Sequence, residues 1–124
     1  MARIVVVDDD LNTREMLASF LRRLDHDVEL AANGKEAMAI LDATTQDLVL
    51  TDINMPEMDG IEVINALREK PSGIPVIAMS GGGIYGKEFL LANAKLLGAV
   101  TTVAKPIELA ELKEAIDEAL AGGG

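Results

Sequence analysis

The sequence contains no cysteine and almost no aromatic side chains. Its 124 residues include no tryptophan, one tyrosine and two phenylalanines. The absence of cysteine excludes a disulfide framework and a thiolate-ligated metal site. Hydrophobic residues still make up 49% of the chain, so any core must be built from Val, Ile, Leu, Met and Ala. An aliphatic composition of this kind suits helices packed on a parallel sheet.

Long apolar runs are also missing. The longest are far shorter than the ~20 residues that a membrane span requires. The acidic run Asp8-Asp9-Asp10 interrupts the only early apolar segment, which argues against a signal peptide. We therefore expect a soluble, cytoplasmic protein that makes no membrane contact.

Positive charge is scarce, and the formal net charge is −10. Binding of nucleic acid needs a positive face against the phosphate backbone, so we expect no direct contact of this domain with nucleic acid. Clustered carboxylates suit a metal cation or a basic protein partner. Taken alone, however, the charge is explained more simply as a surface that keeps the protein soluble.

Short β-branched runs alternate with longer runs of helical periodicity along the whole chain. Strands are expected at residues 4–7, 27–31, 48–51, 75–79 and 100–104, and helices at 12–24, 35–42, 60–70, 87–97 and 108–120. Such alternation predicts an α/β fold, a five-stranded parallel sheet with five helices that cover both of its faces. For the strand order we expect the doubly wound, flavodoxin-like order 2-1-3-4-5. One domain is expected over residues 1–121, with a flexible glycine tail or linker at 122–124.

Apolar residues at helical spacing predict which helix faces are buried. For the first helix these are Met16, Leu17, Phe20, Leu21 and Leu24, and for the last helix Leu109, Leu112, Ile116 and Leu120.

Polar residues end four of the five expected strands. Asp8 and Asp9 follow the first strand, Asp52 the third, Ser80 the fourth and Lys105 the fifth. In open parallel sheets, sites form beyond the carboxyl ends of the strands. With the expected strand order, the first and third strands are neighbours, so the three aspartates should lie within a few ångströms of one another.

Such an acidic cluster has a chemical consequence. Two carboxylates about 4 Å apart repel each other by roughly 4 kcal/mol at an effective dielectric of 20, so three of them favour a bound cation. Oxygen ligands and retained waters suit Mg²⁺. An aspartate can act as a nucleophile towards phosphorus if the incoming charge is neutralised, and a cation, the Lys105 ammonium and the Ser80 hydroxyl would do this.

Each of these residues has a simpler interpretation when it is taken singly. Asp10 fits a helix cap better than a metal ligand. Ser80 beside glycines is an ordinary turn residue, and Lys105 is an ordinary surface lysine, although Lys105-Pro106 is a place for a cis peptide bond. Their meeting at one edge of the sheet favours the functional interpretation.

The whole chain resembles the receiver domains of two-component response regulators. The resemblance rests on Val6 to Asp10, on the nine-residue segment Asp52-Ile53-Asn54-Met55-Pro56-Glu57-Met58-Asp59-Gly60, on Met79-Ser80-Gly81 and on Lys105-Pro106. Any one of these motifs is weak evidence. Their order and spacing together are specific.

The resemblance implies a role for each matching residue. Asp52 would be the phosphoacceptor, and Asp9 and Asp52 would bind Mg²⁺ directly. The main-chain carbonyl of Asn54 would be a third ligand, and Asp8 would act directly or through water. Ser80 and Lys105 would contact the phosphoryl group.

The resemblance also implies partners. The phosphodonor would be a sensor histidine kinase or a phosphotransfer protein, and the output would pass to a downstream protein or an attached effector domain. The domain would assist its own phosphorylation and dephosphorylation without being a turnover enzyme. In one departure from the family pattern, Thr102 stands where many members carry an aromatic switch residue, so we expect the glycine-rich segment 81–83 to change conformation instead.

Three other functions fit the residues of this chain less well. An aspartyl-phosphate hydrolase would carry a second aspartate at position 54, where this chain has Asn54. A flavodoxin-like electron carrier would need a hydroxyl-rich phosphate loop and aromatic residues, which are absent. A degenerate receiver that serves only as a binding module would have lost Asp52 or Lys105. The cognate kinase, the output and the oligomeric state are not encoded in any motif.

Overall fold

The computed structural model describes residues 2–52, 74–80 and 101–122. Along the chain these residues form β1 (Arg3–Val7), α1 (Leu11–Arg23), β2 (Asp27–Ala31), α2 (Gly34–Ala43), β3 (Leu48–Asp52), β4 (Val76–Ser80), β5 (Thr101–Ala104) and α5 (Leu109–Gly122). The helices expected at 60–70 and 87–97, Asn54 and the segment 81–83 lie outside the described residues.

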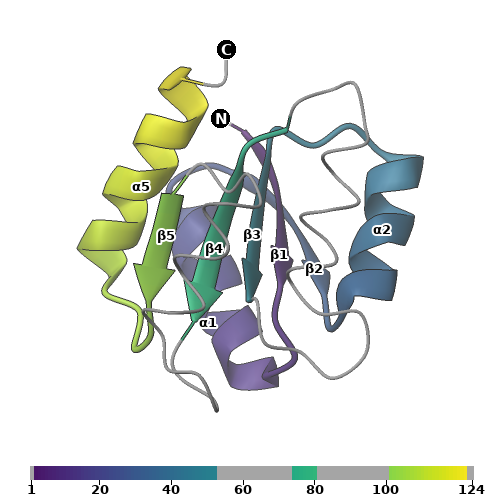
Figure 1. Cartoon of the computed structure of the whole chain (residues 1–124), viewed down its shortest axis with the longest axis horizontal. Coiled ribbons are helices and arrows are strands. Elements are labelled where there is room, and N and C mark those ends of the chain that lie inside the picture. Colours follow the sequence, from purple (N-terminus) through teal and green to yellow (C-terminus); the bar gives the residue numbers. More distant parts are fainter. Residues whose placement is uncertain (1, 53–73, 81–100, 123–124) are drawn as a thin grey trace.

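The five strands form one parallel sheet of order β2-β1-β3-β4-β5 (Figure 1). This confirms the expected topology. In the register of the sheet, Val7 of β1 pairs with Thr51 of β3. The next residues along the two strands, Asp8 and Asp52, are therefore brought to the same edge by backbone pairing alone.

Helices cover both faces of the sheet, as Figure 1 shows. On one face, Ala37 and Leu41 of α2 pack with alternate residues of the central strands. On the other face, Leu17 and Leu21 of α1 and Leu112 and Ile116 of α5 form a larger cluster. The buried side chains of these clusters are all aliphatic or Met, as the composition predicts, and Phe20 packs against the larger cluster while only partly buried. Among the described residues, no helix combines the length and apolar character that crossing a bilayer requires.

The structure corrects details of the expected elements. Met16, placed on the buried face of α1, is 40% exposed, and the small Ala18 is buried instead. The reason is geometric: Leu17 and Leu21 point at the sheet, and Met16 is turned away from it. Helix α1 begins at Leu11 and not at Asn12. Gly122, assigned above to the tail, is the last residue of α5.

Helix α1 begins immediately after the acidic run, and Asp10 is its N-cap. The Oδ2 atom of Asp10 accepts hydrogen bonds from the Thr13 amide at 2.9 Å and from the Thr13 hydroxyl at 2.6 Å. These bonds lower the pKa of Asp10 below its ordinary value, because they favour the charged form. The interpretation of Asp10 as a cap is thereby confirmed.

The cap yields a prediction about stability. Asp10→Ala should lower the midpoint of urea unfolding, because the Thr13 amide loses its acceptor. Asp10→Asn should retain most of the stability, since the amide oxygen still accepts. Because the pKa is lowered, the contribution of the aspartate is complete above about pH 4, its ordinary value, and is lost as the pH falls further through the lowered pKa. Equal losses in the Ala and Asn variants at pH 7 would show that the charge matters and the cap does not.

Candidate functional site

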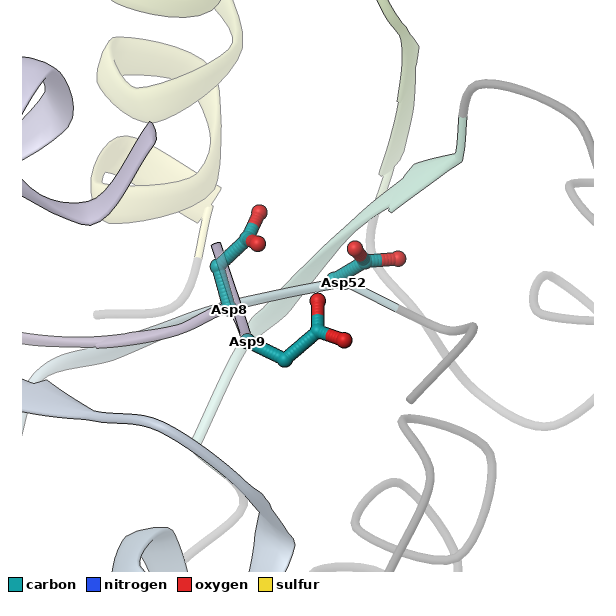
Figure 2. Close-up of side chains that lie close together, drawn as sticks. All are labelled: Asp8, Asp9 and Asp52. Carbon is teal, nitrogen blue, oxygen red and sulfur yellow. The ribbon is translucent and has the colours of Figure 1, made fainter. Parts of the chain in front are cut away.

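Three carboxylates converge at the carboxyl edge of the sheet. Asp8 and Asp9 follow β1 and Asp52 ends β3, and one oxygen from each lies within 4.8 Å of the others (Figure 2). Asp8 is fully buried and Asp52 is 6% exposed, whereas Asp9 is exposed. The three side chains form an acidic cluster in which only Asp9 opens freely to solvent.

The ammonium group of Lys105 bridges two members of the cluster. Its Nζ donates to Asp8 Oδ2 at 2.8 Å and to Asp52 Oδ2 at 2.9 Å. Partial burial by itself lowers the pKa of Lys105, but the hydrogen bonds to Asp8 and Asp52 and their negative charges raise it above the ordinary 10.5. Lys105 is therefore a positively charged counter-ion inside the acidic cluster at neutral pH.

Hydrogen bonds of its amide, its carbonyl and its carboxylate hold Asp8 in place. Its amide donates to the Ala31 carbonyl at 3.1 Å, which continues the pairing of β1 with β2. Its Oδ1 accepts from the Asp10 amide at 2.9 Å. Its carbonyl accepts from Nη1 of Arg14 at 2.8 Å. Sequence reasoning missed Arg14, because an arginine in the first turn of an exposed helix is typical of a solvated surface.

The structure places most of the expected site residues together. Asp8, Asp9, Asp52 and Lys105 meet at one edge. Ser80 ends β4 in register with Ala104, the residue before Lys105, so its backbone lies at the same edge. The Lys105-Pro106 peptide bond, which the sequence marks as a place for a cis bond, is cis.

The cluster suits a divalent cation in both ligand type and charge. Its ligand atoms are all carboxylate oxygens, which Mg²⁺ favours. Three negative charges and the positive charge of Lys105 leave a net charge that a divalent cation would neutralise. Of the three carboxylates, that of Asp9 is exposed to solvent, whereas that of Asp8 is buried.

The comparisons with known proteins agree with this geometry. The family model "Response regulator receiver domain" matches residues 4–117. The chain therefore belongs to the response-regulator receiver family, whose members accept phosphoryl groups in two-component signalling. It is a signalling domain.

This chain covers very different shares of the length of two curated relatives. Sporulation initiation phosphotransferase F of Bacillus subtilis is 34% identical over 118 residues, which cover 95% of this chain and 93% of that protein. The regulatory protein AtoC of Escherichia coli is 36% identical over 118 residues, but these cover 95% of this chain and only 25% of that protein. The chain thus spans nearly all of one relative and a quarter of the other.

Solved structures show the same fold. The CheY-like response regulator receiver domain protein of Methanospirillum hungatei superposes with a TM-score of 0.89 at 28% identity and covers 99% of this chain and 96% of that one. Chemotaxis protein CheY4 of Vibrio cholerae gives a TM-score of 0.85 at 27% identity and covers 97% and 99%.

The bridging lysine leads to a prediction for the metal-free protein. Lys105→Met should lower the free energy of unfolding at pH 7 by about 2 kcal/mol, because it leaves two buried carboxylates facing each other without a counter-ion. Lys113 offers a matched control, since its Nζ lies 2.9 Å from Asp117 Oδ2 on an exposed part of α5. Lys113→Met should cost about 0.5 kcal/mol or less.

Chemical denaturation over a pH series checks both effects. Because the pKa of Lys105 is raised, its contribution should be complete below about pH 10 and disappear as the pH rises through the raised value. The difference between wild type and Lys105→Met should therefore be constant from pH 7 to about pH 9 and shrink above pH 10. A Lys105→Met variant as stable as Lys113→Met would contradict the role of Lys105 as counter-ion.

Proposed function

We propose that Asp52 accepts the phosphoryl group and that Asp9 and Asp52 bind Mg²⁺ directly, with Asp8 acting directly or through water. The observation that carries this proposal is the position of the Asp52 carboxylate, which ends β3, belongs to the acidic cluster and accepts a hydrogen bond from the Lys105 ammonium. No other carboxylate in the described part of the chain belongs to the acidic cluster and also ends a central strand. The main-chain carbonyl of Asn54, outside the described residues, completes the proposed ligand set.

The reaction follows from the groups present. A carboxylate oxygen of Asp52 attacks phosphorus, and the bond from phosphorus to the donor nitrogen breaks. The donor imidazole leaves with the electron pair of that bond, and Asp52 becomes an acyl phosphate. Bound Mg²⁺ would neutralise charge on the phosphoryl oxygens. Lys105 already donates to Asp52, so a short movement would pair its ammonium with a phosphoryl oxygen. Ser80, at the end of the neighbouring strand, would supply a hydroxyl hydrogen bond.

The proposed partners follow from this chemistry. The donor is a phosphohistidine on a sensor histidine kinase or a phosphotransfer protein, and the phosphorylated domain acts on a downstream protein or an attached effector domain. The two lengths of the curated relatives support both arrangements of the output. We place the reaction in the cytoplasm, where the ATP used by a kinase is found, and propose that the domain assists its own dephosphorylation.

Phosphorylation by a small donor tests the assignment of Asp52. Incubation with acetyl phosphate and Mg²⁺ should add one phosphate to the intact protein, as seen by mass spectrometry. Asp52→Asn should abolish the addition, because an amide oxygen is a poor nucleophile towards phosphorus. Asp42→Asn, a substitution on helix α2, serves as the control and should be phosphorylated like wild type. Persistent phosphorylation of Asp52→Asn would show that another residue is the acceptor.

The affinity for Mg²⁺ distinguishes the proposed metal ligand Asp9 from the helix cap Asp10. Asp9→Ala should weaken Mg²⁺ binding, measured by titration calorimetry, by about tenfold, since it removes a carboxylate from the cluster. Asp10→Ala should change the affinity much less, because the Asp10 carboxylate is committed to the Thr13 amide and hydroxyl. Equal effects of the two substitutions would mean that the cation is held by general negative charge and not by the proposed ligands.

A further inference from the structure

Arg14 makes two hydrogen bonds to the acidic segment, residues 8–10. It lies in the first turn of α1, where its amide donates to the Asp10 carbonyl at 3.0 Å. Its side chain turns back, and Nη1 donates to the Asp8 carbonyl at 2.8 Å. In the described part of the chain, Arg14 is the one basic side chain that bonds the main chain of residues 8–10.

The carbonyl that Arg14 holds belongs to the peptide group between Asp8 and Asp9. Fixing this carbonyl fixes the plane of that peptide, and the plane sets the direction in which the following residue leaves the strand. Asp9 is exposed, and within the described residues no hydrogen bond or ion pair holds its side chain. The position of the Asp9 carboxylate therefore depends on its main chain.

We propose that Arg14 is a positioning residue for the cation site. Its guanidinium holds the Asp8–Asp9 peptide so that the Asp9 carboxylate stays within reach of Asp52, and the site is assembled before the cation arrives. The inference rests on the function proposed above. It assigns to Arg14 a task that is distinct from those of the phosphoacceptor, the carboxylate ligands and Lys105.

Two effects of Arg14 on a cation have opposite signs, which makes the proposal testable. The positive charge of the guanidinium repels a cation, so a purely electrostatic role predicts tighter binding when the charge is removed. A positioning role predicts weaker binding, because outer groups that orient ligands typically contribute about tenfold to a hundredfold in metal affinity. The sign of the change identifies the role.

The first measurement is the Mg²⁺ dissociation constant of four proteins by calorimetry. Arg14→Met, which removes both the donor and the charge, should raise the constant about threefold to fivefold, less than the loss of the Asp9 carboxylate itself. Arg14→Lys keeps the charge and one donor group and should lie between Arg14→Met and wild type. Arg22 provides the control, since its Nη2 donates to the Val28 carbonyl at 3.2 Å from the far end of the same helix. Arg22→Met should bind Mg²⁺ within about twofold of wild type.

The second measurement needs no metal. The Asp10 amide donates to Asp8 Oδ1, so its hydrogen exchange reports on the order of the acidic segment. In the metal-free protein, exchange at Asp10 should become several-fold faster in Arg14→Met and stay unchanged in Arg22→Met. Because Arg14→Lys retains the charge and a donor, it keeps the test decisive if Arg14→Met folds poorly.

The outcomes separate this inference from the proposed function. If wild type binds Mg²⁺ and Arg14→Met binds it equally well or more tightly, the positioning role is wrong and the proposed function stands. An unchanged exchange rate at Asp10 in the Arg14→Met protein would also overturn the positioning role. If wild type fails to bind Mg²⁺ at millimolar concentration, the proposed function itself is wrong.

Discussion

Like-charge repulsion at the edge of the sheet is the constraint on which the site depends. Three carboxylates lie within 4.8 Å of one another, and two of them are almost completely buried. Charges of one sign at such separations, shielded from water, require a counter-charge. Lys105 supplies part of it through bonds to Asp8 and Asp52. The remaining negative charge favours a bound cation, and this is the physical basis of the proposed Mg²⁺ site.

The parallel sheet is what makes this arrangement possible. Lys105 is 97 residues from Asp8 and 53 residues from Asp52 in the sequence. Asp52 ends β3, and Asp8 and Lys105 directly follow β1 and β5, so the register of the sheet brings all three to one edge. The aliphatic clusters on both faces hold the strands in that register. Asp8 uses its amide, its carbonyl and both carboxylate oxygens in hydrogen bonds, so it anchors the site, and Asp9 remains open to solvent.

Much of this arrangement was predictable, because periodicity and strand order are local or topological properties. The alternation of strands and helices predicts a parallel sheet, and the expected order 2-1-3-4-5 then predicts that Asp8 and Asp52 meet. The bridge from Lys105 to both aspartates depends on side-chain direction in three dimensions, which no spacing encodes. Arg14 was missed for the same reason: its contact is with a main-chain carbonyl. The exposure of Met16 shows the limit of a periodicity argument at the edge of a helix face.

The central claim is that the Asp52 carboxylate, which shares the Lys105 ammonium with Asp8, becomes an acyl phosphate. Reduction of the phosphorylated wild-type protein with borohydride converts an aspartyl phosphate to homoserine, and mass spectrometry of its peptides then locates the modified residue. The account predicts homoserine at position 52 and at no other position. Homoserine at position 8 or 9, or a phosphorylated protein that yields no homoserine, would contradict it.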